Sequence, residues 1–289
     1  MVDLFGNEII EDALLRDRFL EPPFSVLDTR SGSWQKRKKQ WKDKGIESEI
    51  VRKTELCMAQ SINKYDFRES YTGTSVFDPA LTELMYRWFC PVNGKILDPF
   101  AGGPVRGIVA NYLDYYYTGI ELSHDQVDYN RKNALDVLPV NNQPNWYGGD
   151  SDQILNDRFI HDFDMIFSCP PYLDLEIYSN NINDLSNMTD RDFIKKYNSI
   201  IKKSCSKLKK DGYAVFVVGD VRDKKTGFYK DFITITKNAF YNAGMGLYNE
   251  MILLENGLNT AAMRCAKIFK SGKKLTKVHQ NVLVFKGLS

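Results

Sequence analysis

The feature that most constrains the fold of this 289-residue chain is a regular alternation of short apolar runs with longer segments of helical apolar spacing. We expect strands and helices to alternate at 95–98, 104–113, 116–121, 123–137, 145–148, 164–168, 190–209, 213–218 and 229–243. Such alternation predicts an α/β fold with a doubly wound, mostly parallel sheet. Residues 247–254 and 281–285 complete the sheet as a late hairpin, which adds an antiparallel strand.

The turn after the first strand of this series is rich in glycine. Residues 98–103 are Asp-Pro-Phe-Ala-Gly-Gly, and Pro104 is well placed as the first residue of a helix. A strand, a glycine turn and a helix let the backbone approach a nucleoside-type cofactor closely. The three spaced glycines of a dinucleotide site are absent, so a nicotinamide cofactor is disfavoured.

Three successive predicted strands end in a carboxylate: Asp98, Glu121 and Asp150. Asp98 lies at a strand tip, where it could meet a cation. Glu121 lies 19 residues beyond Gly102, close to the spacing at which an acid meets ribose hydroxyls. Since ligands of open α/β sheets bind at the carboxyl ends of the strands, we expect these side chains to share a site.

The fourth predicted strand ends in the sequence Ser168-Cys-Pro-Pro-Tyr172. Two adjacent prolines fix two φ angles and remove two backbone donors, so the carbonyls there are held stiffly and can accept hydrogen bonds. Tyr172 could stack on a base drawn out of a nucleic-acid strand, whose exocyclic amine would then donate to those carbonyls. A strand end followed by a stiff loop explains this corner alone, but the upstream glycine turn favours a ligand site.

Together, Asp98-Pro-Phe-Ala-Gly102 and Pro170-Pro-Tyr172 resemble the motifs of the S-adenosylmethionine-dependent DNA methyltransferases that modify exocyclic amines. Two residues depart from the family pattern. Pro104 stands where the final glycine of the first motif is expected, and Cys169 stands where Asp, Asn or Ser opens the second. The resemblance, which includes phage-borne DNA methylases, extends over nearly the whole chain through residues 21–30, 74–79, 218–223 and 277–285.

The resemblance implies a Rossmann-like methyltransferase fold, S-adenosylmethionine as cofactor and DNA as substrate. The modified atom would be adenine N6, slightly favoured, or cytosine N4, after base flipping. The implied cofactor-binding residues are Asp98, Pro99, Phe100, Gly102, Gly103, Glu121, Leu122, Asp150, Ser151, Thr74, Ser75 and Phe77. Asp98 and Gly102 would line the methionine part. Glu121 would hold the ribose, and Asp150 would lie beside the adenine.

The catalytic corner would activate the target amine. An amine conjugated to a base ring is a poor nucleophile, and hydrogen bonds from its protons to fixed acceptors raise the electron density on its nitrogen. Pro170 can supply one acceptor, its carbonyl. Cys169 is a weak acceptor, so the second acceptor stays open between Ser168, a backbone carbonyl and Asp174. The implied catalytic residues are Ser168, Cys169, Pro170, Pro171 and Tyr172.

Cys169 also permits a different reaction. A thiolate could add to C6 of a pyrimidine and activate C5 for methylation. Cytosine-C5 enzymes, however, carry their cysteine after the proline, and no evident cation lowers the pKa of this thiol. The simplest role for Cys169 is packing beneath the loop.

Positive charge is concentrated near the C-terminus, although the net charge is only +2. No acidic residue follows Glu255, whereas many basic residues do. Gly272 and the irregular spacing predict an exposed basic loop that meets phosphates with salt-dependent affinity. Its candidate DNA contacts are Arg264, Lys267, Lys270, Lys273, Lys274 and Lys277. A second basic run, 34–42, fits either phosphate binding or a solvated helix whose two tryptophans pack on the core.

A long polar connection, residues 173–189, follows the catalytic corner and is typical of a lid or recognition element. Its candidate contacts to the target base are Asp174, Glu176 and Tyr178. A surface loop that ends in a helix cap at Thr189 is an equal alternative. Arg222 could hold a phosphate, although an ion pair with Asp220 or Asp223 is the simpler explanation.

We expect an N-terminal extension at 1–72, with a basic helix at 33–44 and a mobile loop at 53–73. A catalytic domain at 73–289 follows, with the basic segment 256–278 inserted before its last strand. Asp78 before Pro79 is typical of a helix cap, and packing of that helix explains Phe77 as well as cofactor binding does.

Composition agrees with a globular enzyme, since 43% of residues are hydrophobic and 26% are charged. No apolar run approaches the ~18–20 residues of a membrane span. The five scattered cysteines favour a cytoplasmic protein, and only three histidines argue against a zinc site. The resemblance to phage-borne methylases implies the cytoplasm of a bacterial host. The sequence leaves open whether the protein is a monomer or a homodimer and whether it has a restriction partner. Two alternative functions also stay open: an RNA or other amine methyltransferase, and an inactive DNA-binding protein.

Overall fold

The computed structural model describes residues 20–46, 77–158, 160–173, 184–223, 225–255 and 259–288. Its strands are β1 (Val26–Asp28), β2 (Lys95–Asp98), β3 (Tyr116–Glu121), β4 (Asn145–Gly148), β5 (Phe163–Ser168), β6 (Leu208–Val218), β7 (Met245–Leu254) and β8 (His279–Gly287). Its helices are α2 (Gly32–Lys42), α3 (Pro79–Phe89), α4 (Val105–Tyr112), α5 (His124–Val137), α6 (Ser151–Ile154), α7 (Asp190–Cys205), α8 (Phe232–Asn242) and α9 (Asn259–Gly272). A single 3-10 turn within these ranges covers Leu185–Asn187.

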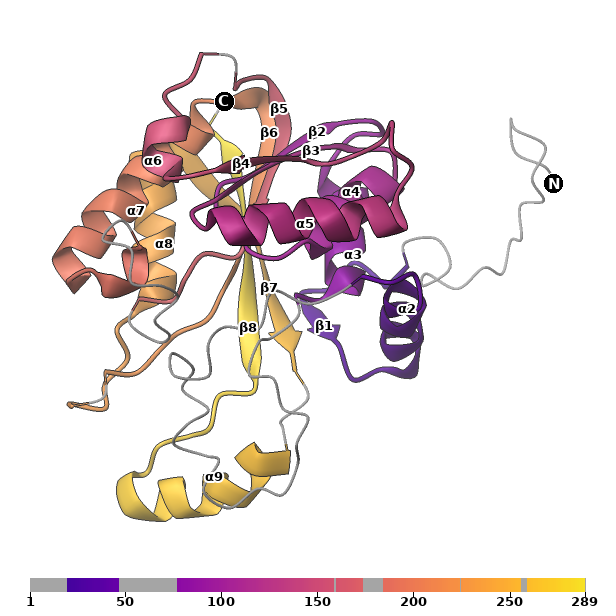
Figure 1. Ribbon diagram of the computed structural model, residues 1–289. Coiled ribbons are helices and arrows are strands. Elements are labelled where there is room, and N and C mark those ends of the chain that lie inside the picture. The colour runs from indigo at the N-terminus through magenta and orange to yellow at the C-terminus, as the bar shows by residue number, and fades with distance from the viewer. Residues whose placement is uncertain are drawn as a thin grey trace.

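Within the described residues, the strands form one sheet in the order β1-β7-β8-β6-β5-β2-β3-β4 (Figure 1). Every neighbouring pair is parallel except the two pairs that β8 makes with β6 and β7. The prediction of a mostly parallel sheet with a late antiparallel strand is therefore confirmed. Because β6 and β7 both run opposite to β8, β7 has the same direction as the parallel strands.

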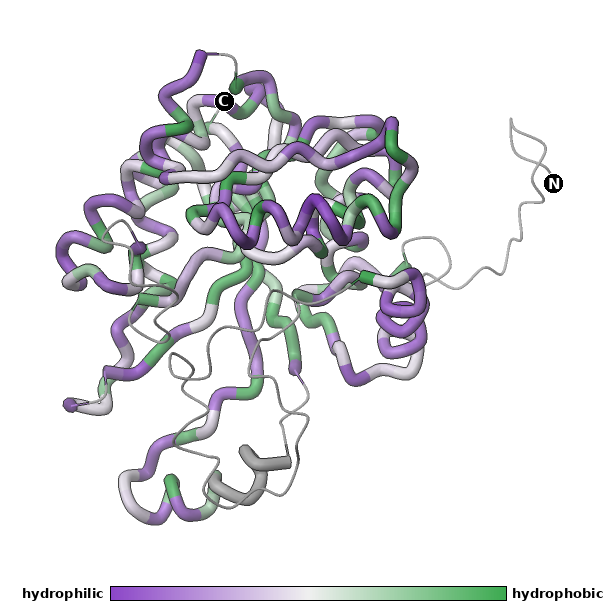
Figure 2. The backbone as a smooth tube through the Cα atoms, viewed as in Figure 1, coloured by the Kyte–Doolittle hydropathy of each residue, from purple (hydrophilic) through white to green (hydrophobic). Residues whose placement is uncertain are grey.

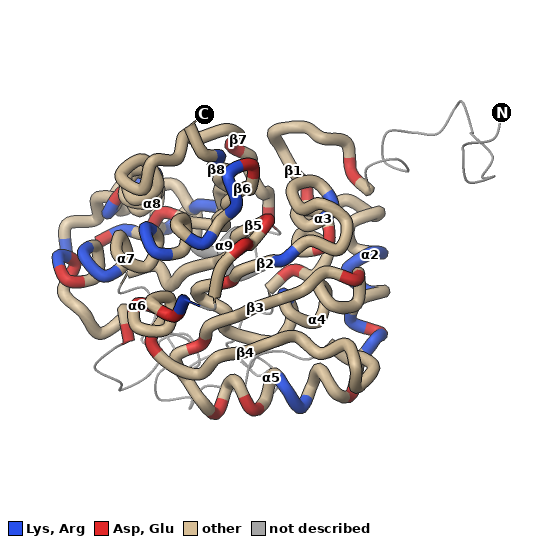
Figure 3. Tube along the Cα trace, turned by 90° about the horizontal axis from the view of Figure 1, so that it is seen from above, with Lys and Arg blue, Asp and Glu red and all other residues tan. Residues whose placement is uncertain are grey.

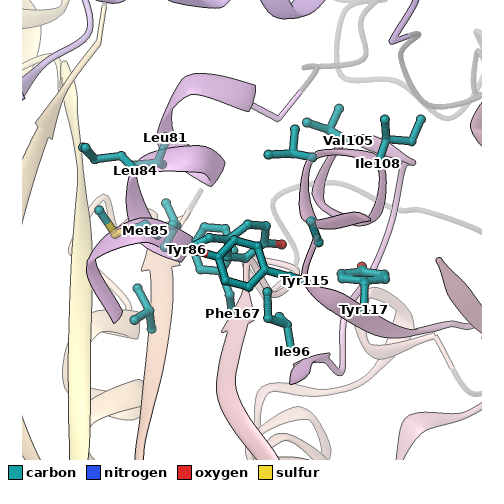
Figure 4. Close-up of a cluster of buried hydrophobic side chains, with 14 of the residues drawn as sticks. Leu81, Leu84, Met85, Tyr86, Ile96, Val105, Ile108, Tyr115, Tyr117 and Phe167 are labelled. Atoms are coloured by element: carbon teal, nitrogen blue, oxygen red, sulfur yellow. The ribbon is translucent and has the colours of Figure 1, made fainter. Parts of the chain in front are cut away.

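Helices cover both faces of the sheet, because successive side chains of the central strands point to opposite faces. In β5, Met165 and Phe167 join the cluster under α3 and α4, whereas Ile166 joins the cluster under α7 and α8. Tyr86 of α3 meets Phe167 edge to face, with 5.4 Å between ring centroids (Figure 4). The central strands are accordingly mostly hydrophobic, whereas α2, α5 and α7 are largely hydrophilic (Figure 2).

The basic run at 34–42 forms α2, which packs on α3. Its two tryptophans are buried, and their indole nitrogens donate to acidic residues next to and within α3. Trp34 donates to Asp78 at 3.1 Å, and Trp41 donates to Glu83 at 2.7 Å. Burial alone raises the pKa of Glu83. Hydrogen bonds from Arg37 and Trp41 and the charges of nearby arginines together have the larger, opposite effect, so the pKa lies below its ordinary value. These contacts support the interpretation in which the tryptophans pack on the core.

Asp78 caps α3 as expected, because its side chain accepts from the backbone of Ala80 and Leu81. Lysine and arginine positions follow one another along α2, which contains no acidic residue, whereas α7 begins with an acidic turn and carries its lysines further along (Figure 3). No helix among the described residues is long and apolar enough to cross a membrane.

Two expectations about secondary structure were wrong. The basic segment before the last strand is helical over Asn259–Gly272 and is not a loop. Its alanines and other strong helix formers explain the helix, which ends at Gly272. The helix expected at 190–209 ends at Cys205, since Leu208 already belongs to β6. Strand β1, which pairs with β7 at the edge of the sheet, was not predicted.

Candidate active site

The sheet reverses its winding direction at β2. Strands β3 and β4 follow on one side of it, and β5 and β6 follow on the other. Ligands of open α/β sheets bind outside the carboxyl ends of the strands at such a point. The glycine loop follows β2 and the Pro-Pro-Tyr corner follows β5, and Leu97 of β2 is in register with Ile166 of β5. The two motifs therefore leave the sheet side by side.

The glycine loop is held on two sides. Gly102 has a φ of +53°, a left-handed conformation that glycine adopts at little cost. Its N–H donates to Glu121 Oε2 at 2.9 Å, and its carbonyl accepts from Asn130 Nδ2 at 2.8 Å. The N–H of Ala101 donates to the carbonyl of Ile120 at 3.0 Å. The loop is thus fixed to the end of β3 and to α5 before any ligand arrives.

Asp98 does not lie open at the strand tip, because its side chain is wholly buried. It accepts from Arg106 Nε at 2.5 Å, from the Tyr117 hydroxyl at 2.8 Å and from Ser168 Oγ at 2.5 Å. The backbone N–H of Phe100 adds a fourth hydrogen bond at 3.2 Å. Asp98 therefore connects the glycine loop, β3 and the Pro-Pro-Tyr corner through hydrogen bonds inside the protein.

Arg106 completes this arrangement from the first turn of α4. Its Nη2 donates to the carbonyls of Phe100 and Ala101, each at 2.8 Å. Burial, the largest single influence, lowers the pKa of Arg106, but the charge of Asp98, the nearby Tyr117 and Cys169 and the hydrogen bond to Asp98 together raise it above the ordinary value. Sequence reasoning did not assign Arg106 a role, although it follows Pro104 by only two residues.

Phe77 covers the buried ion pair. The guanidinium of Arg106 lies 4.5 Å from the centroid of the Phe77 ring, a distance typical of a cation–π contact. The same ring meets Phe167 edge to face at 5.7 Å. Packing therefore accounts for Phe77. Its predicted neighbours Thr74 and Ser75 lie outside the described residues.

The remaining predicted cofactor residues lie at the ends of β3 and β4. Glu121 is half-buried, and its Oε1 accepts from the N–H of Ser123 at 2.8 Å. Leu122 follows it and is likewise half-buried. Asp150 caps α6 and forms an ion pair with Lys196 of α7 at 2.7 Å, which the sequence did not reveal. Ser151 Oγ donates to the carbonyl of Pro99 at 2.6 Å and joins this loop to the first.

The Pro-Pro-Tyr corner is partly buried. Pro170 is buried, Pro171 is half-buried, and Cys169 packs against the cluster under α3 and α4. The ring of Tyr172 lies 5.8 Å from that of Phe232, centroid to centroid. Its hydroxyl lies 3.4 Å from Cys169 Sγ. It also lies 3.4 Å from the carbonyl of Val217 and 3.3 Å from Gln280 Oε1.

A segment rich in basic residues begins at the same end of the sheet as the two motifs. Since β7 runs in the direction of the parallel strands, the segment after β7 starts at the carboxyl ends of those strands, where the glycine loop lies (Figure 1). The exposed lysines of this segment are Lys267, Lys270, Lys273 and Lys274. Lys277 is half-buried, and burial lowers its pKa even though Asp220 and Glu255 act in the opposite direction.

Arg222 is held by the loop after β6. Its Nη1 donates to the carbonyl of Gly227 at 2.9 Å, and its guanidinium lies 3.8 Å from the centroid of the Tyr229 ring. Some predicted features lie outside the described residues. They are the expected mobile loop at 53–73, the side chain of Arg264, and the candidate base contacts Asp174, Glu176 and Tyr178.

No protein-family model and no curated protein matches this chain. Solved structures do match it. TrmN from Thermus thermophilus is 14% identical, with 73% of this chain covering 49% of that one and a TM-score of 0.50. The chain therefore spans about half the length of TrmN. It has the Rossmann-like methyltransferase fold.

Two further structures are less similar in shape. A TehB-like SAM-dependent methyltransferase from Corynebacterium glutamicum is 17% identical, covers 76% of this chain and 92% of its own, and has a TM-score of 0.45. Another protein from Thermus thermophilus, named provisionally as a DNA modification methylase, is 15% identical. It covers 49% of this chain and 52% of its own, with a TM-score of 0.36. At these identities the likeness concerns the fold alone.

Proposed function

We propose that this protein transfers a methyl group from S-adenosylmethionine to an exocyclic amino group of a DNA base, with adenine N6 slightly favoured over cytosine N4. The observation that carries the proposal is the hydrogen bond from Ser168 to Asp98, at 2.5 Å. It joins the loop suited to a nucleoside cofactor to the corner suited to a flat base, at the point where the sheet reverses. A methyl donor and its acceptor need this adjacency.

The residues around the glycine loop fit the cofactor. Gly102 exposes backbone where a side chain would obstruct a nucleoside, and Glu121 presents a half-buried carboxylate fixed by two backbone amides. Such a carboxylate is suited to accept the ribose hydroxyls. Asp150 would lie beside the adenine, next to Lys196. Asp98 would act through the shape of the loop, since its carboxylate is already bound by four donors.

The chain's own groups would prepare the amine. When bound, S-adenosylmethionine supplies an electrophilic methyl group, so that an N–C bond forms as the C–S bond breaks, a neutral thioether leaves and a proton passes from nitrogen to water. The carbonyl of Pro170 accepts a hydrogen bond from the amine, and the ring of Tyr172 stacks on the base. These contacts orient the nitrogen and keep its lone pair directed at the methyl carbon.

The exposed lysines of α9 and the segment after it support a polyanionic substrate. Their segment starts at the carboxyl ends of the parallel strands, where both motifs lie, so a nucleic-acid strand bound to it would pass over the site. The exposed Ile268, Phe269 and Leu275 lie among them and add apolar surface for bases or sugars. Basic residues interleaved with apolar ones are typical of a nucleic-acid surface.

Transfer of labelled methyl groups tests the proposal. Purified protein is incubated with methyl-labelled S-adenosylmethionine and either unmethylated genomic DNA or total RNA, and the nucleosides are then separated. The proposal predicts label in N6-methyladenine or N4-methylcytosine from DNA. Label in RNA alone, or at C5 of cytosine, would replace the proposal with one of the alternatives.

A further inference from the structure

The hydroxyl of Tyr172 lies among more acceptors than it can serve. The carbonyl oxygen of Val217 and the amide oxygen of Gln280 lie 3.4 Å and 3.3 Å away, and Cys169 Sγ lies at 3.4 Å. A hydroxyl has one proton and can donate to only one of the two oxygens at a time. All three separations are also long for a hydrogen bond to a hydroxyl. Gln280 Oε1 is therefore an acceptor that a donor other than this hydroxyl could use.

Glu255 fixes the orientation of Gln280. Gln280 Nε2 donates to Glu255 Oε1 at 2.6 Å. Burial raises the pKa of Glu255; above that pKa its carboxylate can only accept, so the amide nitrogen faces Glu255 and the amide oxygen faces Tyr172. Glu255 itself is half-buried just after β7, where its N–H donates to the carbonyl of Val278. The acceptor oxygen of Gln280 is therefore held in place by a neighbouring strand end.

The antiparallel strand explains how a residue so late in the chain reaches the corner. Because β8 runs opposite to its neighbours, its first residues lie where the parallel strands end. Asn281 pairs with Val218 at the end of β6, which places Gln280 beside the loops after β5 and β6. The ring of Tyr172 also lies close to Gly219, the residue after β6.

We propose that Gln280 Oε1 is the second acceptor for the target amine. The inference rests on the proposed function, and it assigns to Gln280 the role that Cys169 fills poorly because a thiol sulfur is a weak acceptor. In the free protein the Tyr172 hydroxyl lies 3.3 Å from Gln280 Oε1, the acceptor that the amine would use. When the ring turns to stack on a base, the amine donates one proton to the Pro170 carbonyl and the other to Gln280 Oε1. Glu255 is then a positioning residue for Gln280.

The first test is Gln280→Leu, with Gln143→Leu as a matched control. Gln143 is also half-buried, but it precedes β4 and so lies at the opposite edge of the sheet. We expect Gln280→Leu to lower kcat for methyl transfer to unmethylated genomic DNA by about 100- to 1,000-fold, as for removal of one preorganised polar group that acts on the reacting atom. KM for DNA and cofactor binding should change less than about threefold. The control should keep wild-type kcat.

A double-mutant cycle separates this role from simple support of Tyr172. If Gln280 acted only by holding the hydroxyl, Gln280→Leu would cost nothing further in a Tyr172→Phe background. We expect the full reduction in kcat to persist there. Absence of that reduction in the double variant would overturn the inference.

An exchange of the pair guards against misfolding. In the variant Glu255→Gln with Gln280→Glu, the amide at 255 can donate to a carboxylate at 280, whose other oxygen can accept the amine. We expect this variant to recover kcat relative to Gln280→Leu, whereas failure to recover in a folded, cofactor-binding variant would contradict the inference. If wild-type protein transfers no methyl group to DNA, the proposed function itself fails. If wild type is active and Gln280→Leu is equally active, only the role of Gln280 fails.

Discussion

Replacing Arg106 with methionine should destabilise the protein strongly, because the substitution leaves a carboxylate buried without its counter-ion. The side chain of Asp98 is wholly buried, and that of Arg106 is 6% exposed. Removing one partner of such a pair costs about 3–5 kcal/mol of the free energy of unfolding. The carbonyls of Phe100 and Ala101 also lose their donor, but these contributions overlap with the first and should not be added to it.

For a chain of this size, 1 kcal/mol corresponds to about 2–4 °C in Tm, so Arg106→Met should lower Tm by roughly 6–20 °C. Thermal and urea unfolding of wild type and variant measure this effect. Arg30→Met is the control, because Arg30 forms an exposed ion pair with Asp28 and should change Tm little. Adding Asp98→Asn to Arg106→Met should restore part of the stability, since a neutral amide is less costly to bury. A Tm for Arg106→Met as high as that of the control would refute the reasoning.

Tyr172→Ala should abolish nearly all methyl transfer while cofactor binding by calorimetry is retained; unchanged turnover would refute the stacking role. Glu83 has a depressed pKa in the folded protein, so its stabilising contribution is present above the unfolded value near 4.5 and is lost as the pH falls through the folded value. Glu83→Gln should therefore flatten the acid limb of a plot of Tm against pH, and an unaltered limb would count against this role. Replacing Lys267 and Lys270 with Gln should reduce the log–log salt slope of DNA binding by about 0.9 for each phosphate that the variant no longer neutralises. Lys132→Gln, at an exposed lysine of α5, is the control. A slope equal to that of the control would exclude both lysines from the interface.

The strands that build the site were predictable because each is a short run with apolar or aromatic residues that is bounded by turn residues. The expected bounds of β2, β3 and β4 coincide with those of the structure. Strand β1 has three residues and little apolar pattern of its own, so only its pairing with β7 defines it. Helix α9 was missed because its charge and Gly272 were weighed above the helix propensity of its alanines.

The site was predictable only in part, for a related reason. The strand-end rule for parallel sheets brings the loops after β2 and β5 together from sequence alone. It says nothing about which side chain fills the space between them. The ion pair of Asp98 with Arg106, the pairing of Asp150 with Lys196 and the approach of Gln280 all depend on tertiary packing. Gln280 reaches the corner only because β8 runs in reverse.

The most direct test of a methyl-transfer site for DNA amines is mass spectrometry of nucleosides after incubation with trideuteromethyl-labelled S-adenosylmethionine. Unmethylated genomic DNA should yield N6-methyladenine or N4-methylcytosine that carries the trideuteromethyl group with wild-type protein, and almost none with Tyr172→Ala. If a folded protein that binds the cofactor leaves the nucleosides of this DNA unlabelled, the account is contradicted.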